Sequence, residues 1–258
     1  MLLYRLGPEG LYAVQEEPGG ELRTLYSDPF ETLPGGWELG NPVPADSAWP
    51  LAPVLPGKIV GIGRNYLEHA RELGNEPPAE PLIFLKAPSS VVGPNVPIVL
   101  PPESERVEHE GEIAVVVRQR LRRAGREEAA SGILGVTAAN DVTARDLQRR
   151  DATFARAKSF DTFCPLGPAI LLRPDLDELE VATRVNGAER QRGHVRQMSF
   201  GLVDLLVYVS RMMTLEPGDV LLTGTPAGVG PLADGDVVEV EVSGVGVLRN
   251  PVEAWRQS

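Results

Sequence analysis

Three glutamates stand at alternate positions in residues 107–118, whose sequence is VEHEGEIAVVVR. If this segment is a strand, Glu108, Glu110 and Glu112 share one face, because successive side chains alternate across a strand. Residues two apart on a strand lie about 6–7 Å apart, so two such side chains can converge on one cation. Mg²⁺ prefers oxygen ligands, and a pair of glutamates would need a third carboxylate from elsewhere. The alternative interpretation of this segment alone is a strand entrance with a solvated face.

The third carboxylate is expected to be Asp141, which ends the apolar segment GILGVTAAND. From the end of a strand its side chain can reach a site at the edge of a sheet, and capping of the following helix is the alternative role. His69 and Glu72 lie three residues apart in a predicted helix and therefore share a face. An imidazole that a carboxylate orients is the arrangement that a general base requires, and an exposed surface pair is the alternative.

Lys158 is one of only three lysines among 25 basic residues, which singles it out, and a surface lysine is the alternative interpretation. Three familiar active-site patterns do not fit the sequence. GIGRNY has Tyr66 where a dinucleotide-binding fingerprint has its third glycine, and TGTPAGVG lacks the lysine of a phosphate-binding loop. Cys164 is the single cysteine, and core packing is favoured over a nucleophilic role.

Composition and charge exclude some classes of partner. The chain has 258 residues and a formal net charge of −11 with no basic stripe, so nucleic acid is not an expected partner. No apolar run has the length of a membrane span, and the first residues, MLLYRLGPEG, lack the pattern of a signal peptide. One cysteine excludes an intrachain disulfide and favours a reducing, cytoplasmic location. A small molecule is the expected partner.

These candidate residues must be positioned by a fold with two predicted parts. Short strands joined by turns are predicted over residues 1–33, and residues 40–57 contain five prolines and are predicted to be a linker. The chain is therefore divided into a small N-terminal β domain with its linker, residues 1–55, and a catalytic domain, residues 56–258.

The catalytic domain is predicted to consist mainly of strands, among them KIVGIG, PLIFLK, VPIVLP, EIAVVVR and DVVEVEV. A helix is predicted over residues 65–74, with Asn65 as its N-cap and Gly74 at its end. A second helix is predicted over residues 199–213, with Ser199 as its cap. Many short strands with few helices indicate a β-rich α+β fold.

Six motifs in a fixed order give the chain a family resemblance: GIGRNYLEHA, PLIFLKAPSS, HEGEIAVVV, ANDVTARDLQ, AKSFDTFCPLGP and LLTGTPAGVG. Together they resemble the fumarylacetoacetate hydrolase family over residues 58–252. The resemblance implies a mixed β-sandwich roll, usually a homodimer, with a site for Mg²⁺ that Mn²⁺ or Ca²⁺ can occupy instead. The residues before the first motif resemble the variable N-terminal extension of prokaryotic members.

The resemblance also implies roles for individual residues. It assigns the metal ligands to Glu110, Glu112 and Asp141, and leaves Glu108 as an additional carboxylate nearby. The other assignments are His69 and Glu72 as a dyad on a lid helix, Gln148 and Lys158 as active-site donors, and Thr225 with Gly224 as contacts to a substrate carboxylate.

One stretch departs from the larger eukaryotic hydrolases of this family. Those enzymes have an additional aspartate ligand and a tyrosine shortly before the histidine, where this chain has Ile62, Gly63 and Arg64. The chain therefore resembles the smaller prokaryotic members, and hydrolysis of fumarylacetoacetate itself is not expected. A 2-oxo acid would be drawn to the metal, to Arg64 and Lys158, and to backbone N–H groups.

Several reactions fit such a site. A metal would polarise the C2 carbonyl of a 2-oxo acid, and His69 would move a proton or activate water. The first-choice activity is isomerisation of 2-hydroxyhepta-2,4-diene-1,7-dioate in aromatic catabolism, with decarboxylation as an associated activity. The runner-up is an acylpyruvate hydrolase or an oxaloacetate decarboxylase. The more distant alternative is a non-catalytic metabolite-binding protein on the same fold, which would have no use for His69.

Overall fold

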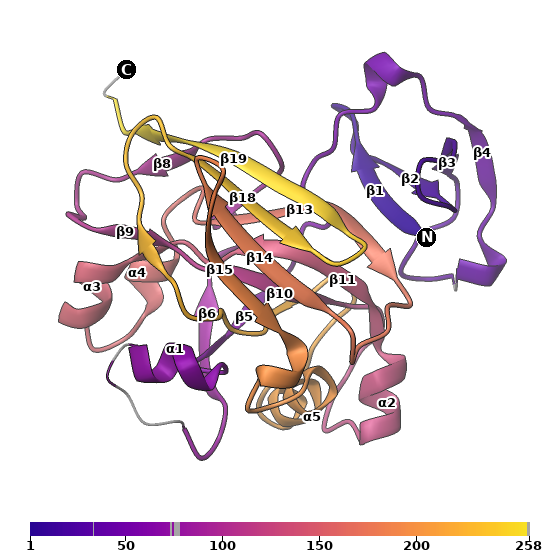
Figure 1. Cartoon of the computed structure of the whole chain (residues 1–258). Helices are drawn as coiled ribbons and strands as arrows, with labels where there is room; N and C mark the ends of the chain where they lie inside the picture. Colours follow the sequence, from indigo (N-terminus) through magenta and orange to yellow (C-terminus); the bar gives the residue numbers. More distant parts are fainter. Residues whose placement is uncertain (33, 73, 75–77, 257–258) are drawn as a thin grey trace.

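Strands dominate the computed structural model of the chain, which describes residues 1–32, 34–72, 74 and 78–256 (Figure 1). The largest sheet has the order β4-β3-β2-β1-β13-β11-β10-β16-β5-β6, with β7 paired to β13. Its strands are β1 (Leu2–Leu6), β2 (Leu11–Gln15), β3 (Leu22–Leu25), β4 (Leu39–Pro42), β5 (Ile59–Gly63), β6 (Leu82–Lys86), β7 (Val91–Val92), β10 (Gly111–Val117), β11 (Ile133–Asn140), β13 (Cys164–Leu172) and β16 (Val220–Leu222). The pairs β16–β5 and β13–β7 are parallel and the others antiparallel, so the sheet is mixed.

Two smaller sheets complete the β structure. One has the order β15-β14-β18-β19-β8 and the other the order β12-β9-β17. Their strands are β8 (Ile98–Leu100), β9 (Val107–His109), β12 (Thr143–Ala144), β14 (Glu180–Val185), β15 (Ala188–His194), β17 (Gly230–Pro231), β18 (Val237–Val242) and β19 (Gly246–Ala254). The predicted β-rich α+β fold with mixed sheets is confirmed.

Strand β10 lies at the centre of the molecule and is buried on both faces along its whole length. Ile113 and Val115 pack into the core that the main sheet shares with β14, β18 and β19. Ala114 and Val116, which point the other way, pack with residues of β1, β2 and β13. Burial on both sides explains why this segment is a continuous apolar run. It also makes β10 a rigid support for the residues at its start.

The N-terminal strands extend the main sheet, because β1 pairs antiparallel with β13 through Leu2 and Leu3. Figure 1 shows them at one side of the molecule, with α1, α3 and α4 on the other. Strand β4 falls partly within the predicted linker of residues 40–57, since its pairing with β3 includes Pro42. The division of the chain at residue 55 stays a prediction.

The helices are short: α1 (Leu67–Glu72), α2 (Arg126–Ser131), α3 (Arg145–Arg150), α4 (Ala155–Lys158) and α5 (Leu202–Met212). The helix predicted over residues 65–74 is confirmed only as α1, and its residue 73 lies outside the described residues. No helix among the described residues is long and apolar enough to cross a membrane.

The two helix caps predicted from the sequence are wrong. Asn65 precedes α1 but bonds across the fold: its Nδ2 donates to the carbonyls of Phe200, at 3.1 Å, and Thr223, at 2.8 Å. Its Oδ1 accepts the N–H of Phe200 at 2.9 Å. The N-cap of α5 is Gly201, without a side-chain hydrogen bond, and Ser199 instead donates its N–H to the carbonyl of Asn65. Asn65 therefore fastens the start of α1 to the segments before α5 and after β16.

Candidate metal centre and active site

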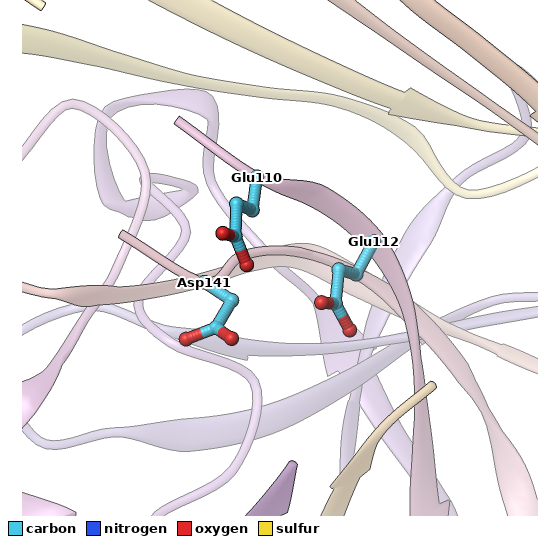
Figure 2. A group of neighbouring side chains, drawn as sticks. All are labelled: Glu110, Glu112 and Asp141. Carbon is cyan, nitrogen blue, oxygen red and sulfur yellow. The ribbon is translucent and has the colours of Figure 1, made fainter. Parts of the chain in front are cut away.

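The side chains of Glu110, Glu112 and Asp141 converge where β10 begins and β11 ends (Figure 2). All three are buried, and each offers a carboxylate oxygen within 4.8 Å of the others. Residues 107–117 are not one strand, because β9 ends at His109 and β10 begins at Gly111. The backbone N–H of Asp141 donates to the carbonyl of Glu110 at 2.8 Å, which holds these two residues side by side.

Glu112 is held from the other side by the loop after β16. Its Oε2 accepts the backbone N–H of Gly224 at 2.7 Å. Gly224 has φ +100°, and a Cβ there would lie 2.7 Å from that of Asn65, so only glycine fits. The predicted contact of Gly224 with a substrate carboxylate stays a prediction, with its amide already engaged by Glu112.

Three buried cations surround the carboxylates. The Nζ of Lys158 donates to Oε2 of Glu110 at 2.7 Å and to Oδ2 of Asp141 at 2.5 Å. The Nζ of Lys86 donates to Oδ1 of Asp141 at 2.5 Å. Arg145 forms ion pairs with Glu110 and with Glu108, the latter at 2.6 Å from its Nε. Every oxygen of Glu110 and Asp141 thus has a cationic partner.

The balance of charge differs among the glutamates. Burial favours the neutral form of each, but Arg145 and Arg106 outweigh burial at Glu108 and hold its pKa below the usual range. Lys158 and Arg145 do the same for Glu110, whose pKa is also lowered. At Glu112, burial and then the neighbouring carboxylates of Asp141 and Glu110 raise the pKa well above the usual range. Four buried carboxylates face three buried cations, and Glu112 is the one left over.

This donor set fits a hard divalent cation. The three converging ligands are all carboxylates, the oxygen donors that Mg²⁺ prefers, and a further cation would favour the charged form of Glu112, whose pKa is raised. Among the described residues, no other cluster of three or more histidine, cysteine or acidic side chains is arranged to hold a metal.

The predicted dyad lies on α1. The Nδ1 of His69 and Oε2 of Glu72 are 3.1 Å apart, and His69 is 4% exposed. The carboxylate of Glu72 also accepts the backbone N–H of Gly228 at 3.1 and 3.2 Å. Because Glu72 faces Nδ1, the Nε2 of His69 is the nitrogen left for chemistry.

A cavity of about 290 Å³ joins these groups. Eight of the ten residues predicted for the site line it: Arg64, His69, Glu110, Glu112, Asp141, Gln148, Lys158 and Thr225. The hydroxyl of Thr225 donates to the carbonyl of Gly111 at 2.8 Å and accepts from Nε2 of Gln191 at 2.7 Å. Its proton is therefore already used within the protein, and the predicted contact of Thr225 with substrate stays a prediction.

Known proteins resemble the chain over most of its length. A family model described as fumarylacetoacetate (FAA) hydrolase C-terminal matches residues 58–253. The chain belongs to the fumarylacetoacetate hydrolase family. A solved 5-carboxymethyl-2-hydroxymuconate delta-isomerase from Mycobacterium smegmatis is 41% identical, with a TM-score of 0.89 over 99% of this chain and 100% of that one. A 2-hydroxyhepta-2,4-diene-1,7-dioate isomerase from Mycobacterium marinum is 39% identical, with a TM-score of 0.84 over the full length of both chains.

A human relative adds a third named activity. The mitochondrial oxaloacetate tautomerase FAHD2A of Homo sapiens is 43% identical over 215 residues, which cover 78% of this chain and 68% of the human protein. The predicted family is confirmed, and its members include isomerases, hydrolases and tautomerases. The chain therefore belongs to a family whose named members are enzymes.

Two basic residues of the candidate site, Lys86 and Arg145, were not predicted from the sequence. Lys86 ends the apolar strand β6 just as Asp141 follows β11, and that similarity was the available signal. Arg145 lies three residues before Gln148 on α3, so the two share a face, and its Nη1 donates to Oε1 of Gln148 at 2.5 Å. The sequence around Lys86 and around Arg145 does not by itself indicate that either side chain is buried.

Cys164 does not take part in the site. It is fully buried in the core beside β1 and β2, and burial raises the pKa of its thiol to about 12. The interpretation of Cys164 as a packing residue is confirmed by its place in the buried core.

Proposed function

We propose that the protein is a divalent-metal-dependent isomerase or tautomerase of a 2-oxo dicarboxylic acid, with 2-hydroxyhepta-2,4-diene-1,7-dioate as its first candidate substrate. One observation carries the proposal: a single cavity is lined by the carboxylate cluster, by Lys158 and by His69. The cavity thereby brings the groups that would bind a 2-oxo acid, the carboxylate cluster and Lys158, together with His69, which would move a proton.

The carboxylates of Glu110, Glu112 and Asp141 would hold the cation. When bound, a divalent cation supplies a Lewis acid for the carbonyl of a 2-oxo acid. Lys158, which lines the cavity, keeps two of its three N–H donors on Glu110 and Asp141, so one would remain for a developing negative charge.

His69 would carry the proton. Glu72 fixes the imidazole through Nδ1, which sets Nε2 as the basic nitrogen. In isomerisation, a proton leaves the 2-hydroxyl group of the dienol and a proton is added to a carbon of the conjugated chain, which leaves a 2-oxo acid with the same atoms. His69 would transfer the proton at carbon, and the burial of its side chain limits exchange with water.

A second candidate, keto–enol tautomerisation of oxaloacetate, is supported by the 43% identity to the human tautomerase. It uses the same proton transfer between carbon and oxygen on a shorter dicarboxylic acid. Hydrolysis of an acylpyruvate and decarboxylation differ from both, because they break a carbon–carbon bond. A homodimer, a cytoplasmic location and a lid over residues 65–74 are further predictions that accompany this proposal.

The test is to supply metal-stripped protein, with and without Mg²⁺, with both candidate substrates in D₂O. We expect Mg²⁺-dependent conversion to the isomer or tautomer, with carbon-bound deuterium seen by NMR and no change in the number of carbon atoms by mass. Two fragments formed with water, or loss of CO₂, would instead assign a hydrolase or decarboxylase. Binding of Mg²⁺ and oxalate without any turnover would assign a metabolite-binding protein.

A further inference from the structure

The cavity has a cationic group at its outer part that the proposed chemistry does not use. Arg149 lies on α3 one residue after Gln148 and four after Arg145, and all three line the cavity. Residues spaced by three and four share a helical face, and Arg149 is about 6 Å farther along the helix axis than Arg145. Arg145 is buried and Arg149 is exposed, so this face of α3 runs from the carboxylate cluster to the mouth of the cavity.

The arginines of α3 differ in their partners. Arg145 is committed to Glu108 and Glu110. Arg150 does not line the cavity and lies 3.9 Å from the carboxylate of Asp151. Arg149 forms no ion pair with any of the residues that the structure describes. A guanidinium at the mouth of a cavity in a chain of net charge −11 is available for an anion.

Arg64 brings a second guanidinium to the same cavity from the end of β5. Its φ of +60° lies in the left-handed region, which is uncommon for a residue with a side chain. The wall of the same cavity includes the apolar side chains of Leu82, Phe84 and Phe154. An apolar wall suits the carbon chain of a substrate.

We propose that Arg149, together with Arg64, binds the second carboxylate of the substrate, the one remote from the 2-oxo group. This assignment rests on the proposed function and makes Arg149 a residue that determines specificity for dicarboxylic acids. A guanidinium binds a carboxylate through two parallel N–H donors, which gives direction as well as charge. A 2-oxo acid that ends in a methyl group has nothing to offer these donors.

The test compares two ligands of equal chain length, 2-oxoglutarate and 2-oxopentanoate, by calorimetry with Mg²⁺ present. In Arg149→Met, affinity for 2-oxoglutarate should fall by about two- to fivefold, the upper part of the range for an exposed charged pair, while affinity for 2-oxopentanoate stays the same. Arg64→Met should show the same selective loss. Arg150→Met is the matched control, because it removes an arginine from the same helix outside the cavity, and it should change neither affinity.

Equal losses for both ligands in Arg149→Met, or no loss for either, would overturn the assignment. A loss in Arg150→Met as large as that in Arg149→Met would reduce the effect to general charge and overturn the assignment as well. Oxalate has no remote carboxylate, so its Mg²⁺-dependent binding to the unmodified protein tests the metal centre separately. If oxalate does not bind, the proposed function fails; if it binds and Arg149→Met is not selective, only the assignment of Arg149 fails.

Discussion

The carboxylate cluster and the His69–Glu72 dyad share one cavity but are built in opposite ways. The cluster lies on the central strands β10 and β11, buried on all sides and tied together by Lys86, Lys158 and Arg145. The dyad lies on the six-residue helix α1, where the Glu72 side chain is 34% exposed and, among the described residues, contacts His69 and the backbone N–H of Gly228. The part that binds is buried on all sides, whereas the helix that moves protons is fastened at its start by Asn65 and ends in a partly exposed carboxylate.

This difference implies that binding and turnover can be separated by substitution. Elements with few buried contacts open at low free-energy cost, and helices that carry catalytic groups over a site are often of this kind. Changes in the dyad should therefore leave the folded structure and ligand affinity nearly intact. Changes in the cluster should affect stability first.

The largest effect is expected for His69→Ala. Turnover should fall by about 10²–10⁴-fold, the range for a positioned acid–base group, while affinity for Mg²⁺ and oxalate stays nearly unchanged. Glu72→Gln should reduce turnover less, because the amide oxygen can still accept from Nδ1 of His69 and from Gly228. Rates on the best substrate and calorimetry with oxalate measure the two properties. Turnover of His69→Ala at the unmodified rate would remove the dyad from the mechanism.

A substitution in the cluster, Arg145→Met, should have its main effect on stability. It leaves Glu108 and Glu110 buried with fewer partners, which costs about 3–5 kcal/mol when one member of a buried ion pair is removed. Arg106→Met is the matched control, because Arg106 also pairs with Glu108 but is about half exposed, so it should cost less than about 1 kcal/mol. Urea unfolding gives the free energy of unfolding of each variant. Similar losses in Arg145→Met and Arg106→Met would contradict the view that burial makes the cluster rigid.

The same contrast explains how much could be predicted from the sequence. The carboxylates and the dyad were predicted because their residue types carry chemistry and their spacing places them on one face; Asp141 follows an apolar strand and His69 precedes Glu72 by three residues. Period-two alternation also predicted strands such as β18, where every second residue is buried. Such patterns depend only on residues close together in the chain, so they can be detected in a single sequence.

Contacts between distant segments could not be predicted in this way. Asn65 has the residue type and position of a helix cap, yet its hydrogen bonds to Phe200 and Thr223 span more than a hundred residues of chain. Arg145 has the residue type of a surface position, and the packing of α3 against α4, β9 and β12 buries it. In both cases a partner remote in sequence outweighed the local preference.

The smallest effect is expected in the pH dependence of stability, which depends on the protonation of Glu112. Measuring it with and without metal distinguishes the contribution of the cation from that of the carboxylate cluster. Burial and the neighbouring carboxylates raise the pKa of Glu112 in the folded protein. At pH values between the pKa of the unfolded chain and this raised pKa, the metal-free folded state therefore binds more protons than the unfolded state. Its contribution to stability is therefore full at low pH and is lost as pH rises through the raised pKa, by at most about 1.4 kcal/mol per pH unit. Glu110 has the opposite shift and loses its contribution only as pH falls.

Bound Mg²⁺ needs the charged form of Glu112, so the stabilisation by Mg²⁺ should increase as pH rises. Melting temperatures measured with and without Mg²⁺ over a series of buffers test this. In Glu112→Gln the side chain stays neutral and its amide oxygen can still accept from Gly224, so the fall in metal-free stability with rising pH should become smaller. That variant should also lose most of the stabilisation by Mg²⁺. A stabilisation by Mg²⁺ that does not depend on pH, or that is the same in Glu112→Gln, would place the cation away from this carboxylate, because Glu112 is the converging ligand whose pKa burial and its neighbours raise.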